Sequence, residues 1–255
     1  MADGARPRRL VGVSLKMYFA AARTLSYVTA VLDLLADDPS LPETIDIFVI
    51  PDHISVQNAV SVLRANPAVW VGAQDCAPED GGAFTGCVSP AVLAEVGVRI
   101  VEVGHAERRR LFGETDAGTA AKAAAVARNG MVPLICVGET ERGAVSAAAV
   151  AVAAQVDAVL SGVPEDAEVV LAYEPVWAIG ASEPASVDHV VGVVKEVRAA
   201  AAVRRRSGRT RIVYGGSAGP GLFAKLNVAV DGLFLGRFAH DPKVFMQTAR
   251  EVVGS

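Results

Sequence analysis

Cysteine is scarce in this chain of 255 residues, which contains three: Cys76, Cys87 and Cys136. An odd number, at spacings that match no zinc motif, argues against a disulfide framework and against a structural metal site. We therefore expect reduced thiols in a cytoplasmic protein. No cluster of His, Cys, Asp and Glu has ligand spacing either, so we expect no metal and no cofactor.

Long apolar runs are also missing. The first run, Leu10 to Leu15, is interrupted by Gly12 and Ser14 and ends at Lys16, so it is too short for the core of a signal peptide. No stretch approaches the length of a membrane span. The net charge of -4 lacks the positive excess that attracts nucleic acid or anionic lipid. We expect neither a nucleic acid nor a membrane as a partner.

What the chain does contain is apolar sequence in short pieces. It is 52% hydrophobic and 20% charged, which is enough to bury a large core. Eight short apolar runs alternate with segments of helical composition, and no shift in composition marks a linker. The expected strands are Leu10–Ser14, Ile45–Ile50, Val69–Ala73, Val98–Val103, Val132–Val137, Val169–Tyr173, Arg211–Tyr214 and Gly232–Leu235.

This alternation predicts an α/β fold with parallel strands and right-handed crossovers. Eight strand–helix units in a chain of this length predict one domain, residues 1–255, folded as a closed (β/α)8 barrel. An open doubly wound sheet is the alternative. Such a sheet usually carries a glycine-rich fingerprint after its first strand, and the segment from Val11 to Tyr18 has none.

The stretch from Val169 to Gly180 carries a functional signal. Glu174 follows a buried strand, and Pro175 prevents the strand from continuing. Loops are normally polar, yet the next residues are apolar. An apolar loop beside a carboxylate indicates a lid that excludes water from a site, although a loop packed on a neighbouring element would look the same. The expected lid residues are Pro175, Val176, Trp177, Ala178 and Ile179.

Other strand ends bring further chemistry to the same mouth, since a parallel barrel builds its site there. Lys16, His105 and Glu174 form a general acid–base set with a fixed positive charge. Gly215-Gly216-Ser217, together with Gly236, indicates a phosphate cradle, because glycine lets backbone N–H groups approach an anion. A pair of tight turns would give the same pattern. We assign His53, His189 and His240 to surface or packing roles, because no partner stands at a useful spacing.

Ordered motifs along nearly the whole chain resemble the triosephosphate isomerase family. They are Lys16-Met17, Gly72-Ala73-Gln74-Asp75, Gly82-Ala83-Phe84-Thr85-Gly86, Gly104-His105-Ala106-Glu107-Arg108-Arg109, Cys136-Val137-Gly138-Glu139-Thr140, Ala172-Tyr173-Glu174-Pro175-Val176-Trp177-Ala178-Ile179-Gly180, Tyr214-Gly215-Gly216-Ser217 and Asp231-Gly232. The resemblance implies a TIM barrel that interconverts dihydroxyacetone phosphate and glyceraldehyde 3-phosphate through an enediol, without a cofactor, in glycolysis and gluconeogenesis.

The resemblance also implies roles for single residues. Glu174 would move the proton between two carbons, His105 would polarise the carbonyl, and Lys16 would supply positive charge. This family is itself a standard example of a glutamate base paired with a neutral histidine. A homodimer is implied, in which Phe84 and Thr85 contact the second subunit. The residues expected to bind substrate are Ser14, Gly180, Ser217, Gly236 and Arg237.

Several positions depart from the family pattern. Ser14 stands where the family usually has Asn, Arg237 replaces a phosphate-binding glycine, and Cys87 replaces a Glu that pairs with the arginine at the Arg108 position across the dimer. The variants Ser14-Leu15-Lys16-Met17, Pro184-Ala185-Ser186 and Gly236-Arg237 are similar to those of the family branch that acts on L-erythrulose 1-phosphate. The substrate thus stays open between a triose phosphate and a four-carbon ketose phosphate. A non-catalytic barrel that binds sugar phosphates is a third reading.

Overall fold

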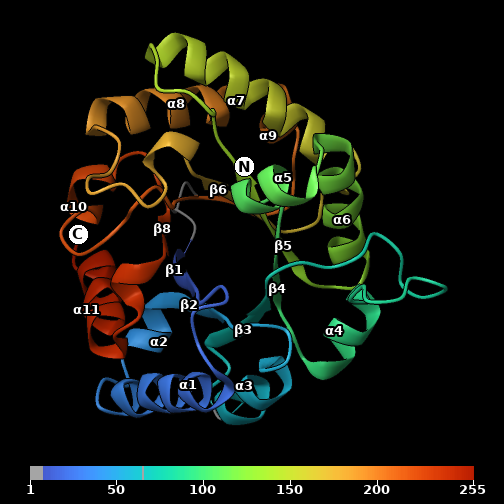
Figure 1. Cartoon of the computed structure of the whole chain (residues 1–255). Helices are drawn as coiled ribbons and strands as arrows, with labels where there is room; N and C mark the ends of the chain where they lie inside the picture. The colour runs from blue at the N-terminus through green and yellow to red at the C-terminus, as the bar shows by residue number, and fades with distance from the viewer. Residues whose placement is uncertain (1–7, 65) are drawn as a thin grey trace.

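A computed structural model describes residues 8–64 and 66–255, in which eight parallel strands close into a barrel surrounded by helices (Figure 1). Each strand pairs with the next along the chain, and β8 pairs with β1 to close the sheet. This topology confirms the expected (β/α)8 barrel and excludes the open doubly wound sheet. The strands are β1 (Arg9–Ser14), β2 (Ile45–Ile50), β3 (Val69–Ala73), β4 (Ile100–Val103), β5 (Val132–Val137), β6 (Val169–Tyr173), β7 (Thr210–Tyr214) and β8 (Gly232–Leu235).

The helices follow the strands in the expected alternation. They are α1 (Ala21–Ala36), α2 (Leu41–Thr44), α3 (Val56–Leu63), α4 (Pro90–Val96), α5 (Ala106–Phe112), α6 (Asp116–Arg128), α7 (Val145–Leu160), α8 (Val187–Ala199), α9 (Ala201–Arg204), α10 (Phe223–Leu226) and α11 (Pro242–Val253), with 3-10 turns η1 (Val176–Ala178) and η2 (Arg237–Ala239). None of the helices in the described ranges is both long and apolar enough to cross a bilayer.

The strands β1 and β7 each begin one residue earlier than expected, and two larger differences from the sequence prediction have a clear cause. The fourth strand begins at Ile100 rather than at Val98, because the Val98 N–H group donates to the Leu93 carbonyl and completes the end of α4. The sequence predicts one helix over residues 187–206 before β7, but the structure divides this segment in two. Ala200, with ψ of 139°, leaves the helical conformation between α8 and α9.

The barrel interior is a packed core in which one glycine is required. A Cβ atom on Gly12 of β1 would lie 2.2 Å from the ring of Phe48, so the ring occupies the space that any side chain there would need. The Phe48 ring in turn lies 5.7 Å from the ring of Phe234, measured between centroids. A second apolar layer lies between the strands and the helices. Burial on both faces explains why the strands read as continuous apolar runs.

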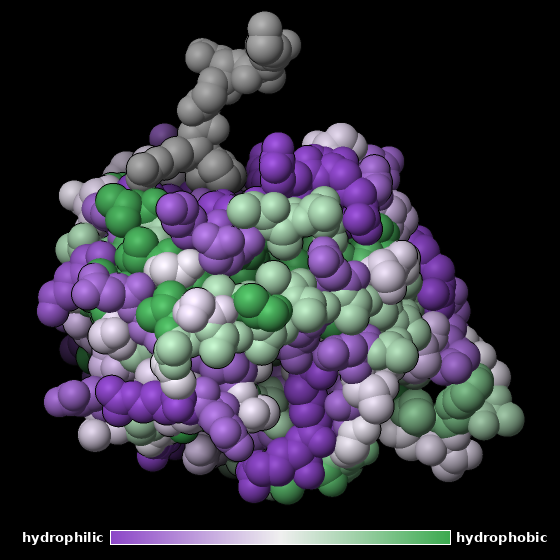
Figure 2. Space-filling model, turned by 90° about the horizontal axis from the view of Figure 1, so that it is seen from above, coloured by the Kyte–Doolittle hydropathy of each residue, from purple (hydrophilic) through white to green (hydrophobic). Residues whose placement is uncertain are grey.

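The segment 74–89 between β3 and α4 projects beyond the ring of helices in Figure 1. Phe84 lies in it with 44% of its surface exposed. In the space-filling view the projection carries hydrophobic surface at its tip (Figure 2). A long ordered loop that exposes an aromatic side chain is typical of a contact surface.

Arg211 forms a buried ion cluster near the N-terminal ends of the strands, away from the end where Glu174 lies. Its side chain is 0% exposed and donates to the carboxylates of Asp46 and Glu168, at 2.6 Å each. Removing one partner of a buried pair leaves the other charges uncompensated. The cluster therefore joins β2 and β7 at the closed end of the barrel.

We predict that Arg211→Ala lowers the free energy of unfolding by about 3 kcal/mol, because Asp46 and Glu168 lose their buried partner and keep only the more exposed Arg8 and Arg209. Urea denaturation checks this value. Arg205→Ala is the matched control, since Arg205 forms an exposed ion pair with Glu165 and should change stability little. Equal effects of the two substitutions would contradict the importance of the buried cluster.

Candidate active site

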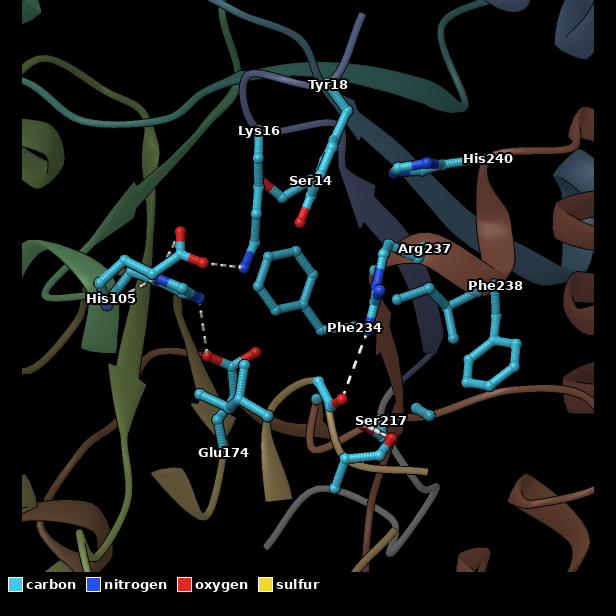
Figure 3. A pocket seen from close by; sticks show the side chains of 18 residues that line it. Ser14, Lys16, Tyr18, His105, Glu174, Ser217, Phe234, Arg237, Phe238 and His240 are labelled. Carbon is cyan, nitrogen blue, oxygen red and sulfur yellow. Dashed lines mark hydrogen bonds and ion pairs between the residues drawn. The ribbon is translucent and has the colours of Figure 1, made fainter. Parts of the chain in front are cut away.

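A cavity of about 540 Å³ opens at the C-terminal ends of the strands. Its volume suits a small ligand. Figure 3 shows side chains from β1, β4, β6 and the loops after β7 and β8 converging on it. The cavity brings together Ser14, Lys16, His105, Glu174, Gly180, Ser217, Gly236 and Arg237, as the sequence predicts. Of the expected phosphate cradle, Gly215 also lines the cavity, but Gly216 does not.

Glu174 is held in place by its backbone and by two glycines. Its N–H group donates to the Val137 carbonyl at 2.9 Å. A Cβ atom on Gly138 would lie 2.0 Å from the Glu174 carbonyl oxygen, and one on Gly215 would lie 2.3 Å from its carboxylate. A larger residue at either position would displace the Glu174 side chain, which lies at the inner end of the cavity and is 5% exposed. Burial raises its pKa to about 7.

His105 faces Glu174 from the other side, with Nε2 lying 3.5 Å from Oε2 of Glu174 (Figure 3). The residue caps the N-terminus of α5, and its Nδ1 accepts a hydrogen bond from the Glu107 N–H group at 3.1 Å. An accepting Nδ1 carries no proton, so the neutral ring carries its proton on Nε2, toward the cavity. Burial and the charge of Lys16 lower the pKa of His105 to about 4, so the ring is neutral near pH 7.

Lys16 is fixed in an unusual backbone conformation. Its φ of 48° lies in the left-handed region, and its carbonyl accepts a hydrogen bond from Gln74 Nε2 at 2.8 Å. The ammonium group lies 2.8 Å from the Glu107 carboxylate. Burial alone would lower the pKa of Lys16, but the hydrogen bond and the charge of Glu107 raise it above the ordinary value. Lys16 therefore keeps its positive charge beside the histidine.

The opposite end of the cavity is lined by glycine backbone and by side chains that can donate hydrogen bonds. Ser217 has φ of 55°, in the left-handed region. Within the described ranges, Lys16 is the only other non-glycine residue with a positive φ. Strained residues of this kind concentrate at functional sites. Gly180 also has a positive φ, of 72°. Arg237 reaches across the opening and donates to the Gly180 carbonyl at 3.3 Å (Figure 3). This end can therefore hold an anion.

The segment after Glu174 is anchored over the cavity. The Ser217 hydroxyl lies 2.8 Å from the Ala178 carbonyl oxygen and 3.0 Å from that of Ala181. The indole N–H of Trp177 donates to Glu139 at 2.9 Å. Of the expected lid residues, Ile179 lines the cavity, and Ala178 is fully buried. Phe84 and Thr85, expected at a dimer contact, lie outside the cavity of their own chain.

Sequence reasoning missed several side chains at this site, Glu102 and His240 among them. Glu102 on β4 is 3% exposed, and its Oε2 lies 2.9 Å from the hydroxyl oxygen of Ser14. The available signal was a lone carboxyl inside the apolar run from Val98 to Val103. His240, assigned to a surface or packing role, both packs against the Phe19 ring and lines the cavity. Its position shortly after the last strand was the signal that could have identified it.

Comparison with known proteins gives one consistent result. Residues 9–252 match the family model described as "Triosephosphate isomerase". The L-erythrulose-1-phosphate isomerase of Pectobacterium atrosepticum is 46% identical over 240 residues, which cover 92% of this chain and 92% of that protein. The protein of the same name from Rhizobium etli is 42% identical, over 90% of this chain and 86% of its own length.

A third relative with that name, from Mesorhizobium japonicum, is 40% identical over 90% of this chain and 91% of its own length. The family model and these identities both extend over nearly the whole barrel. The closed barrel of eight parallel strands agrees with this match. The chain therefore belongs to the triosephosphate isomerase family.

Proposed function

We propose that this chain is a cofactor-independent isomerase of L-erythrulose 1-phosphate. The observation that carries the proposal is the contact between a neutral imidazole and a buried carboxyl group, 3.5 Å apart, at one end of a cavity whose other end suits an anion. Relatives that are 38–46% identical and bear this name support the choice of substrate. A barrel that only bound sugar phosphates would not need Lys16, His105 and Glu174 together.

The substrate defines which atoms react. L-erythrulose 1-phosphate carries its carbonyl at C2, its phosphate on C1, and a hydrogen and a hydroxyl on C3. It corresponds to dihydroxyacetone phosphate with a hydroxymethyl group on the carbon that loses the proton. Removal of the C3 proton gives an enediolate across C2 and C3. Return of the proton to C2 leaves the carbonyl on C3, so the product is a ketose phosphate with the same composition.

Glu174 would act as the base in this sequence, because a carboxylate with a pKa of about 7 can take the C3 proton and return it at C2. The His105 Nε2–H group would donate to the carbonyl oxygen and then exchange protons between the two oxygens. Lys16 would stabilise the negative charge that develops there. Each group acts in the state that the site gives it: Glu174 ionised, His105 neutral and Lys16 charged.

The phosphate would lie at the other end, among Gly180, Ser217, Gly236 and Arg237. Backbone N–H groups at glycines approach phosphate oxygens closely, and the guanidinium group adds a planar pair of donors. Binding the phosphate here would orient C2 and C3 toward Glu174. Isomerisation of a triose phosphate needs the same groups and is the second candidate, favoured by the family model.

We further propose that the enzyme is a cytoplasmic homodimer. The projecting loop 74–89 presents Phe84 and Thr85 away from their own cavity, and a second subunit would cover them. Arg108 is already paired within its own chain, with Asp75 at 2.7 Å and Glu114 at 3.0 Å. Although Cys87 replaces the Glu that would pair with Arg108 of the other subunit, Arg108 would therefore still have partners at the contact.

The Glu174→Gln variant should lose at least about 10²- to 10⁴-fold in kcat, because an amide of the same shape cannot accept the proton. Below about pH 7, kcat/KM of the wild type should fall about tenfold per pH unit, since protonation removes the base. Steady-state kinetics across pH measure both. Glu183→Gln, an exposed change in the same loop, is the control and should turn over normally. Near-normal turnover by Glu174→Gln would refute the assignment of the base.

The ratio of kcat/KM for L-erythrulose 1-phosphate and dihydroxyacetone phosphate tests the substrate. We expect the four-carbon substrate to be preferred by about tenfold or more, because a site that binds an extra hydroxyl group rejects an analogue without it. Ser14→Asn, which adds bulk beside the reacting carbons, should lower this ratio. A wild type that strongly prefers the triose phosphate, with a ratio unchanged in Ser14→Asn, would favour the second candidate.

Sedimentation at micromolar concentration tests the assembly, and we expect a dimer. Phe84→Asp should shift the protein toward monomer and lower its activity, because a charge would be buried at the contact. Val150→Asp is the matched control, since Val150 is 72% exposed on α7 at the outside of the barrel and should leave the dimer intact. A fully active wild-type monomer would disprove the proposed assembly.

A further inference from the structure

Glu102 is a buried carboxyl group that the proposed mechanism does not use. It lies on β4 two residues after Ile100, so strand alternation directs both side chains into the barrel. It does not line the cavity but lies directly behind residues that do. Its Oε2 lies 2.9 Å from the Ser14 hydroxyl oxygen, and its Oε1 lies 3.9 Å from Nε2 of His105.

The surroundings of Glu102 favour its protonated form. Burial raises its pKa to about 8, and the charge of Glu174 adds to this shift, although the hydrogen bond with Ser14 and the charge of Lys16 act in the opposite direction. Glu174, with a pKa of about 7, loses its proton first. Between about pH 7 and pH 8 the two carboxyl groups beside His105 Nε2 therefore hold one proton between them. Glu102 has an acceptor for this proton in Ser14 Oγ at 2.9 Å, whereas Oε2 of Glu174 has no hydrogen-bond partner within the described ranges. The titratable and charged groups that face Glu102 from the surrounding elements are Lys16, His105, Glu107, Cys136 and Glu174.

The protonation state of Glu102 decides whether the Ser14 hydroxyl can donate a hydrogen bond to a substrate or can only accept one. A serine hydroxyl has one proton to donate and two lone pairs to accept with. Protonated Glu102 donates its own O–H to Ser14 Oγ, so the Ser14 proton is free to point into the cavity. Ionised Glu102 can only accept, so the Ser14 proton turns toward it and lone pairs face the cavity.

We propose that Glu102 is a positioning residue for the isomerase reaction. In its protonated form it donates to one lone pair of Ser14 Oγ, so that the Ser14 hydroxyl is left to donate to the substrate oxygen that becomes negative. Ser14 then joins the ammonium group of Lys16 and the Nε2–H of His105 as a third donor at the reacting end of the cavity. This inference rests on the proposed function, because it needs an enediolate to receive the hydrogen bond.

The pH dependence of kcat/KM tests the proposal, with Glu102→Gln as the main variant. The wild type should lose activity above about pH 8, as Glu102 gives up its proton and Ser14 turns away from the substrate. Glutamine is a permanent donor of the same shape, so Glu102→Gln should remain active and lose this alkaline decline. At one pH unit above the wild-type midpoint the variant should be about tenfold more active than the wild type, relative to their plateaus. An alkaline decline unchanged in Glu102→Gln would overturn the proposal.

A double-mutant cycle tests whether Glu102 acts through Ser14. Ser14→Ala should lower kcat by about 10²-fold, the usual effect of removing one donor to a developing oxyanion. Glu102→Leu should lower kcat in the same direction, since the Ser14 hydroxyl loses its orientation. The double variant should be no worse than Ser14→Ala alone, because both changes remove one interaction. Losses that multiply would overturn the proposal.

Glu102→Leu also serves as its own folding control. Leucine suits the apolar interior beside Ile100 and Leu134, and replacing a buried ionisable group by an apolar one is often neutral or stabilising. An unchanged or raised Tm together with a reduced kcat separates positioning from stability.

Infrared spectroscopy separates this inference from the proposed function. A buried protonated carboxylic acid gives a distinct C=O stretching band, and Glu102 is identified by loss of that band in Glu102→Gln. We expect the Glu102 band at about pH 6.5 and its disappearance above about pH 9, as its titration requires. If L-erythrulose 1-phosphate is not turned over but dihydroxyacetone phosphate is, the proposed substrate fails and the pH test is run on the triose. Absence of a Glu102 band at about pH 6.5 overturns the inference whichever substrate reacts.

Discussion

The contact between Glu174 and His105 is the interaction on which the rest of the site depends. The two groups lie 3.5 Å apart, and both are nearly free of water. Burial disfavours the charged form of each, so it raises the pKa of the carboxyl and lowers that of the imidazole. The same desolvation thus gives a carboxyl group that can take up a proton near neutral pH and a neutral ring that can donate a hydrogen bond.

Several parts of the chain, far apart in sequence, hold Glu174 and His105 in position and keep water away from them. Gly215 leaves space for the carboxylate, and the N-terminus of α5 orients the imidazole. The segment around Trp177 begins directly after Glu174 and is tied to Glu139, which also contacts His189 at 2.8 Å. Left-handed conformations at Lys16 and Ser217 place backbone and donors at the two ends of the cavity. The surrounding barrel supplies the rigidity that these strained positions need.

The sequence allowed the architecture to be predicted because buried parallel strands are continuous apolar runs, and the residues after them define one mouth. For that reason Lys16, His105 and Glu174 could be identified before their distances were known. Glu102 could not, because a carboxyl within a strand has no assigned direction until the register of β4 is known. The break at Ala200 was also missed, since alanine favours helix and only the packing of α8 and α9 ends it there.

The ion cluster at Arg211 has a consequence for how the protein is made. Arg211 meets Asp46 from 165 positions further along the chain, and β8 must return to β1 before the sheet closes. Contacts this far apart in sequence form slowly and cannot form before the later partner has been synthesised. The cavity combines Ser14 with Arg237, so a ribosome-bound chain that already contains Lys16, His105 and Glu174 has no complete cavity until its last strand and the turn after it emerge. Activity is thereby confined to molecules that have finished both translation and closure.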